Sequence, residues 1–165
     1  MRILGVDPGS RYTGYGIIDM TQNRLRHVHS GRIEAIKVEG LPQRLLMIYR
    51  ELSRVIEEHQ PQAFALEKIF HSVNPQSSLI LGHARGAAML ACAEAGLEFF
   101  DYSPTEVKNA VVGQGRASKA QVAGMVTILL GLQGSTLAED EADALAVAIC
   151  HAHTVPPQQI AGAKS

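Results

Sequence analysis

The sequence predicts an α/β protein in which a mixed sheet carries helices on its faces. Short apolar runs alternate with longer segments whose apolar residues recur at helical spacing. The length of 165 residues, 46% of them hydrophobic and 19% charged, fits a core large enough for one domain. We find no internal repeat or linker, and we expect one domain over residues 1–153 and a flexible tail over residues 154–165.

The first 36 residues predict three strands of an antiparallel meander, at residues 2–7, 13–20 and 25–36. The first strand ends in Asp7-Pro8-Gly9, where proline and glycine favour a tight turn. A polar cluster at residues 21–23 separates the other two strands.

Helices and two further strands are predicted after residue 40. Apolar residues between Leu41 and Ile56 follow helical spacing, and the pattern stops before Pro61. Residues 63–66 and 97–102 read as strands, and residues 78–95 as a helix with Gly96 as its C-cap. Two or three helices follow. Two of them, at residues 118–130 and 139–153, begin with the capping boxes Ser118-x-x-Gln121 and Thr136-x-x-Glu139.

Two acids stand where strands end. Asp7 follows the first strand and Glu67 follows the fourth. If these strands are parallel neighbours, both carboxylates emerge at the carboxyl edge of the sheet, where α/β proteins place their sites. The alternative is that Asp7 only initiates a turn and Glu67 is only a charge at a strand end.

Two more acids lie on the last helix. Asp140 and Asp143 are three residues apart and share one helical face. Acids in a first turn complement the helix dipole, which accounts for residues 139–141. It accounts poorly for Asp143, one turn further in between two alanines, where aspartate is a weak helix former. Asp143 is therefore the stronger candidate for a functional role.

Four carboxylates gathered at one site repel one another unless a cation neutralises them. Ligation by oxygen alone favours Mg²⁺, with Mn²⁺ as a substitute. Two such ions about 4 Å apart activate water and stabilise the leaving oxygen of a phosphodiester. The four acids, Asp7, Glu67, Asp140 and Asp143, thus predict a metal-dependent nuclease centre.

Charge is segregated although the formal net charge is only -1. Residues 107–138 contain Lys108, Arg116 and Lys119 and no acid, and residues 71–93 contain Arg85 and no acid. We expect these four basic residues to contact DNA phosphates, with solvated surface charges as the alternative. Phe70, close after Glu67, is expected to contact bases, with core packing as the alternative.

Other classes of protein are disfavoured. Cys92 and Cys150 lie in apolar stretches with no nearby ligand spacing, which argues against a disulfide framework or a zinc site. No segment reaches the roughly 18 apolar residues of a membrane span, and the start of the chain lacks the pattern of a signal peptide. We expect a cytoplasmic protein without a membrane partner.

The motifs together resemble the RuvC family of Holliday-junction resolvases. They are GVDPGSRYTGYG at the start, ALEKIF around Glu67, LGHARG at residues 81–86, PTEVKNAVVGQGRASKAQV, and EDEADALAVAICHAH. The resemblance implies an RNase H-like fold. It also implies that Asp7, Glu67, Asp140 and Asp143 are the catalytic, Mg²⁺-binding residues, with Lys108 and Lys119 as basic residues beside the site and Phe70 as the aromatic residue that contacts the junction.

The resemblance further implies a homodimer that nicks two strands of like polarity at symmetric positions in a four-way DNA junction. Such enzymes act in recombination and DNA repair with the RuvA and RuvB branch-migration proteins. A two-fold dimer carries two sites related as the strands of the junction are related.

Three rival interpretations remain. A YqgF-type nuclease shares the opening motif but is not expected to carry LGHARG. An actin-like or sugar-kinase ATPase also pairs an aspartate with glycine and threonine in its first hairpin, but needs two such domains. A non-catalytic DNA-binding module is disfavoured because four acids weaken a surface that only grips phosphate.

Overall fold

The computed structural model describes residues 1–22, 24–68 and 74–155. Five strands form one sheet in the order β3-β2-β1-β4-β5. Their bounds are β1 Arg2–Asp7, β2 Thr13–Thr21, β3 Arg24–Ile33, β4 Ala63–Glu67 and β5 Glu98–Tyr102. The first three strands pair antiparallel, whereas β1 with β4 and β4 with β5 pair parallel. The predicted mixed sheet, a meander plus two parallel strands, is confirmed.

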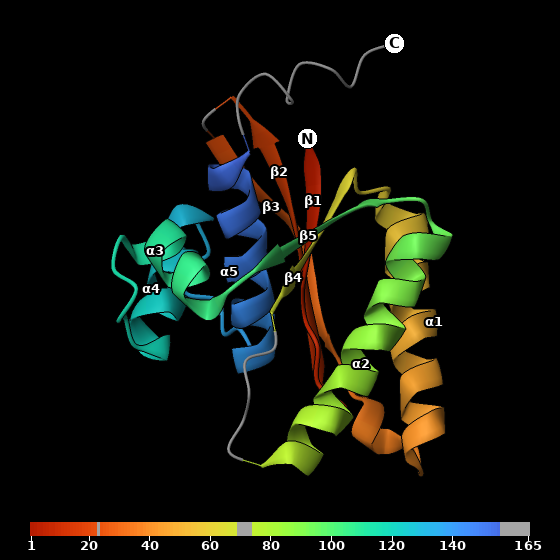
Figure 1. Ribbon diagram of the computed structural model, residues 1–165. Helices are drawn as coiled ribbons and strands as arrows, with labels where there is room; N and C mark the ends of the chain where they lie inside the picture. The colour runs from red at the N-terminus through yellow and green to blue at the C-terminus, as the bar shows by residue number, and fades with distance from the viewer. Residues whose placement is uncertain (23, 69–73, 156–165) are drawn as a thin grey trace.

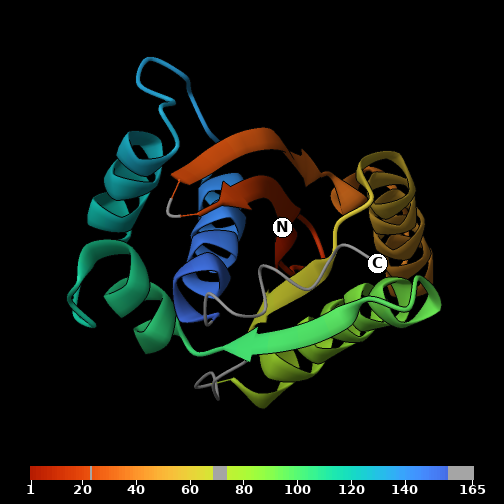
Figure 2. The ribbon, with the colours of Figure 1, turned by 90° about the horizontal axis from the view of Figure 1, so that it is seen from above.

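Helices cover both faces of this sheet (Figure 1). One face carries α1 (Leu41–His59) and α2 (Pro75–Glu94). The other carries α5 (Glu139–Thr154), and α3 (Pro104–Val112) and α4 (Lys119–Leu129) lie outside α5. Seen from above, α5 is enclosed between the sheet and this outer pair (Figure 2).

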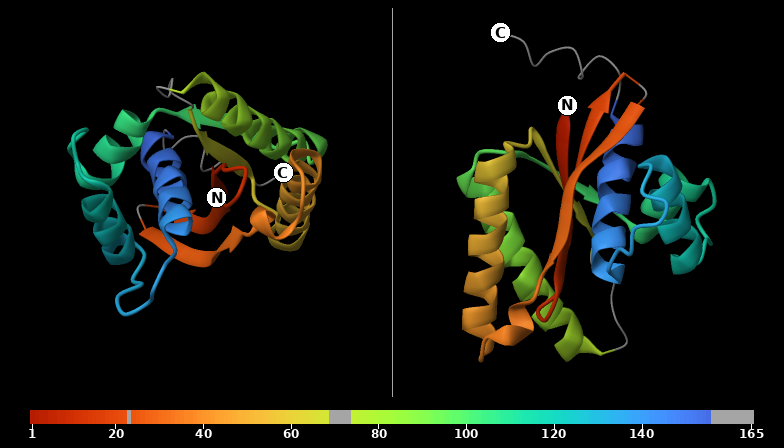
Figure 3. Two further views of the ribbon diagram at one scale, coloured as in Figure 1. Left: turned by 90° about the horizontal axis from the view of Figure 1, so that it is seen from below. Right: turned by 180° about the vertical axis from the view of Figure 1, so that it is seen from behind.

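The alternation of side chains along β1 divides the core between the two faces. Leu4 and Val6 are fully buried in the cluster beneath α1 and α2, whereas Ile3 is fully buried in the cluster beneath α5. The view from behind shows the sheet between these two helical layers (Figure 3). The central strands β1 and β4 are buried on both faces, which explains why they read as apolar runs.

Glycine lets α5 approach the sheet unusually closely. A Cβ atom on Gly5 of β1 would lie 2.2 Å from the Ala144 carbonyl oxygen, and one on Gly14 of β2 would lie 1.8 Å from that of Asp140. No real side chain fits these gaps, so the glycines are required for the contact. This contact fixes the acidic N-terminal half of α5 against the ends of β1 and β2.

Several predicted boundaries are corrected. The third strand ends at Ile33 and is followed by a 3₁₀ turn, Ala35–Lys37, instead of continuing to residue 36. The helix predicted from residue 78 begins at Pro75, capped by the Asn74 side chain. The Ser118–Gln121 capping box is confirmed, but the one predicted at Thr136 is wrong, because α5 begins after Ala138, whose N–H donates to Glu141. No helix in the described ranges is long and apolar enough to cross a membrane.

Candidate active site

The ends of β1 and β4 bring the first two predicted acids to one edge of the sheet. Val6 and Leu66 are partners in the parallel ladder, and Asp7 and Glu67 are the residues that follow them. The strands emerge side by side because their paired segments are apolar and buried on both faces. The register of the parallel β1–β4 ladder therefore places Asp7 and Glu67 at the same edge of the sheet.

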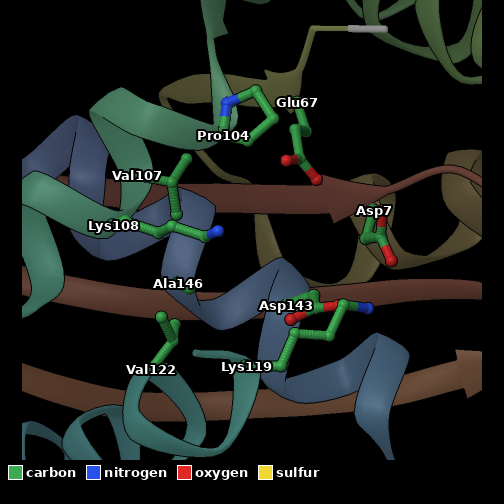
Figure 4. A pocket seen from close by; sticks show the side chains of 9 residues that line it. All are labelled: Asp7, Glu67, Pro104, Val107, Lys108, Lys119, Val122, Asp143 and Ala146. Carbon is green, nitrogen blue, oxygen red and sulfur yellow. The ribbon is translucent and has the colours of Figure 1, made fainter. Parts of the chain in front are cut away.

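A pocket of about 320 Å³ joins these acids to the outer helices (Figure 4). Asp7, Glu67 and Asp143 supply its carboxylates, and Lys108 of α3 and Lys119 of α4 supply its ammonium groups. Its remaining wall is formed by apolar or aliphatic residues: Pro104, Val107, Val122 and Ala146. Residues remote in the sequence thus form one concave, charged site.

Burial and mutual repulsion disfavour the ionised acids here. Burial, reinforced by the charges of Asp143, Glu67 and Asp140, raises the pKa of Asp7 to about 8. Burial and the charge of Asp143 also raise the pKa of Glu67, while Lys119 and Lys108 oppose this shift. A bound cation relieves such repulsion, and the donors are all hard oxygen atoms, so the residues present fit Mg²⁺ or Mn²⁺.

Lys119 is the basic group in closest contact with the acids. Its Nζ donates to Glu139 Oε1 at 2.6 Å and to Asp143 Oδ2 at 3.1 Å. The hydrogen bond to Glu139 is the largest cause of a raised pKa at Lys119. The lysine therefore stays charged and neutralises part of the acidic cluster.

Asp140 lies beside this pocket but does not line it. Its Oδ2 is 3.8 Å from Arg32 Nη1 of β3. Within the described part of the chain, no three acidic, histidine or cysteine side chains are arranged to hold a metal ion directly. Three of the four predicted acids thus share the pocket, and joint ligation of an ion requires their side chains to reorient.

The other predicted DNA contacts are placed differently. Arg116 is exposed in the loop between α3 and α4 and does not line the pocket. Arg85 donates to the Glu67 carbonyl oxygen at 2.8 Å and to Asp101 Oδ1 at 2.6 Å, which differs from the phosphate contact expected of it. Phe70 lies outside the described residues.

Two charged residues near the site could not be predicted from the sequence. The helix dipole alone accounts for Glu139 in the sequence, and Arg32 lies in a strand with no local motif. Their partners, Lys119 and Asp140, come from other elements of the fold. A signal was available for Glu139 only in the surplus of acids at the start of α5.

Comparison with known proteins shows the family to which the chain is similar. Residues 3–151 match the model of the family described as crossover junction endodeoxyribonuclease RuvC. A relative of that name from Alkalilimnicola ehrlichii is 50% identical over 157 residues, which are 95% of this chain and 94% of the relative. One from Geotalea uraniireducens is 53% identical over 154 residues, 93% of this chain and 90% of the relative.

Solved structures give the same result. RuvC of Thermus thermophilus, in complex with a Holliday junction substrate, superposes with a TM-score of 0.87 at 32% identity over 93% of both chains. The yeast mitochondrial Holliday junction resolvase Ydc2, at a TM-score of 0.66 and 14% identity over 92% of this chain and 77% of its own, shares the fold. With a family match over nearly the whole chain and relatives about half identical to it, this protein belongs to the RuvC family of RNase H-like nucleases.

Proposed function

We propose that this protein resolves four-way DNA junctions by hydrolysing phosphodiester bonds with the help of divalent metal ions. The observation that carries the proposal is the pocket in which Asp7, Glu67 and Asp143 face Lys108 and Lys119. Acids suit metal ions and lysines suit phosphate oxygens, so the pocket combines the two kinds of group that phosphodiester cleavage needs. Family membership supplies the four-way junction as the substrate.

The metal of this proposal is Mg²⁺, bound as two ions, with Mn²⁺ as a substitute. Asp7, Glu67 and Asp143 would hold it, joined by Asp140 once that side chain leaves Arg32. When bound, the ions supply activation of water and stabilisation of the leaving oxygen. The raised pKa of Asp7, to about 8, supports this assignment, because a cation removes the repulsion that causes part of it.

The lysines orient the scissile strand in this proposal. Lys108 lines the pocket from α3, and Lys119 lies at the first position of α4, where free backbone N–H groups also favour an anion. Lys119 exchanges its Glu139 partner for a DNA phosphate when the substrate binds. Arg116, exposed in the loop between the two helices, extends the same basic surface.

We also propose that the protein acts as a homodimer through the outer face of α1 and α2. Leu79 and Leu90 of α2 are 62% and 64% exposed, and Leu46 of α1 is 44% exposed. A groove of about 840 Å³ with an almost wholly apolar lining runs between the two helices beside them. An apolar face of this kind suits a second copy of the chain, and two-fold pairing gives two sites for two symmetric nicks.

Three further parts complete the proposal, of which only the protein partners come from the resemblance to the family. Residues 1–153 act as one nuclease domain; the tail predicted from residue 154 starts later than that, because Thr154 ends α5, and its residues 156–165 lie outside the described ranges. The RuvA and RuvB branch-migration proteins are the expected partners in recombination and repair. The protein is expected to work in the cytoplasm.

The test is cleavage of a synthetic four-way junction beside a linear duplex of the same sequence, each strand end-labelled in turn. Nicks at symmetric positions in two strands of like polarity, with Mg²⁺ and not with a chelator, are the expected result. The Asp7→Asn variant should bind the junction and not cut it, since the change removes a carboxylate and little volume. Equal cutting of the duplex, or full activity of the variant, would refute the proposal.

A further inference from the structure

Arg85 of α2 reaches across the edge of the sheet to the residue that carries a site carboxylate. Its Nη1 donates to the main-chain oxygen of Glu67 at 2.8 Å, and its Nη2 donates to Asp101 Oδ1 at 2.6 Å. The side chain is only 15% exposed. The guanidinium is therefore turned toward the protein interior and not toward a ligand in solvent.

This contact holds the strand end where the regular ladder stops. The pairing of β1 with β4 ends at Val6 and Leu66, one residue before Glu67. On the other side, Glu67 pairs with Tyr102, and the Lys68 N–H donates to the Tyr102 carbonyl at 2.7 Å. Arg85 adds a charge-assisted hydrogen bond from a helix at the point where support from β1 has ended.

The guanidinium is itself held in place. Its carboxylate partner, Asp101, pairs in the β4–β5 ladder with Leu66, which is the residue before Glu67. The Arg85 guanidinium carbon also lies 5.7 Å from the centre of the Phe99 ring on the same strand. One rigid planar group thus joins α2, the end of β4 and β5 through two different nitrogen atoms, a fixed geometry that a flexible lysine ammonium does not reproduce.

We propose that Arg85 is a positioning residue that fixes the Glu67 carboxylate relative to Asp7 and Asp143. The inference rests on the proposed nuclease function, in which Glu67 binds metal. Groups that hold a metal-binding carboxylate in place typically affect metal affinity or activity about 10- to 100-fold when they are lost. This role differs from a DNA contact, because it needs the guanidinium to stay paired with Glu67 and Asp101 and not with a phosphate in solvent.

The two roles give different measurements. For a positioning residue, Arg85→Lys keeps the charge and loses one of two hydrogen bonds, so the single-turnover rate falls about 10- to 100-fold and more Mg²⁺ is needed for half-maximal rate. Junction Kd without metal, and its dependence on salt, stay as in the wild type. For a phosphate contact, Arg85→Gln weakens binding and lowers the salt slope by about 1, whereas Arg85→Lys is nearly normal.

The experiment measures Kd at several salt concentrations, single-turnover rate against Mg²⁺ concentration, and thermal stability for Arg85→Lys, Arg85→Gln and Asp101→Asn. Asp101→Asn should change the rate in the same direction as Arg85→Lys by less, because it loosens the guanidinium indirectly. Arg26→Lys, an exposed arginine on β3, is the matched control and should match the wild type.

Two results would overturn the inference. One is wild-type cleavage by Arg85→Lys. The other is a loss of cleavage by Arg85→Lys and Arg85→Gln that only matches the fraction of folded protein lost, which would make the contact purely structural. A wild-type protein that fails to cut the junction would instead refute the proposed function, so the two failures are distinguishable.

Discussion

The Lys119 ammonium lies 3.1 Å from the Asp143 carboxylate and joins α4 to the acidic helix α5. The same ammonium donates to Glu139 at 2.6 Å. The group is partly exposed, so a phosphate can reach it. Lys119 therefore has two partners before DNA arrives, one inside the pocket and one, Glu139, at its rim.

Replacing Lys119 by alanine should weaken junction binding in a salt-dependent way. The change removes one cation from the phosphate contact, so the slope of log Kd against log salt should fall by about 1. Binding titrations at four or more salt concentrations measure this slope. A slope equal to that of the wild type would remove Lys119 from the DNA contact.

Replacing Glu139 by glutamine should tighten junction binding at low salt. The carboxylate competes with phosphate for Lys119, and an exposed pair of this kind is weak, so the gain should be roughly two- to five-fold. The same titrations test it, with Glu57→Gln, an exposed glutamate on α1, as the control. Equal gains in both variants would reflect net charge alone and contradict a specific competition.

The metal-free protein should lose stability as pH rises through the range below the Asp7 pKa of about 8. Aspartate in an unfolded chain ionises near pH 4, so between these values the folded state holds a proton that the unfolded state lacks. The free energy of unfolding therefore falls with increasing pH. Asp7→Asn lacks this titration and should be the more stable protein at pH 8.

Denaturant unfolding between pH 6.5 and 9 isolates this effect. His151 is buried on α5, and burial lowers its pKa to about 4 in the folded protein. In the unfolded chain it titrates near pH 6.5, so its effect on the pH dependence of stability falls below this window. The difference between wild type and Asp7→Asn should grow with pH up to about 8 and then level off. Parallel profiles for the two proteins would show that Asp7 is not strained by its neighbours.

Gly5→Ala should destabilise the protein by about 3 kcal/mol, because the added methyl group would overlap the backbone of α5. It should also reduce cleavage, since α5 carries Asp143. Gly124→Ala on α4 is the matched control, because no atom lies within 4 Å of the added methyl group and helix propensity improves. Similar effects of the two changes in chemical denaturation would contradict the close approach of α5.

The sheet and the acids at its edge could be predicted from the sequence because their signals are local. Strands β1 and β4 are visible as short apolar runs, the first of them followed by a Pro-Gly turn. Asp7 and Glu67 are visible as the acids at the ends of these runs, so no tertiary information is needed. Asp143 could be predicted because an aspartate between alanines within a helix lowers the stability of that helix. These predictions depend on the spacing of apolar residues along the chain and on the backbone conformations that each residue type favours.

The predictions that were wrong or missing concern features set by contacts between elements that are remote in the sequence. The apolar pair Ala35–Ile36 continued the pattern of the third strand, yet the chain turns there into a 3₁₀ helix. The Thr136 motif matched a capping box, but α5 starts two residues later than that motif requires. The partners of Arg85 and Lys119 come from other strands and helices, so no sequence pattern could assign them.

Acids from β1, β4 and α5 are assigned here to one divalent-metal site, and a crystal soaked in Mn²⁺ probes that site without relying on activity. Anomalous difference density should appear in the pocket between Asp7, Glu67 and Asp143, and should vanish in Asp7→Asn crystals soaked in the same way. Density only at other places on the protein, or none with the acids ionised at pH 8.5, would contradict the account.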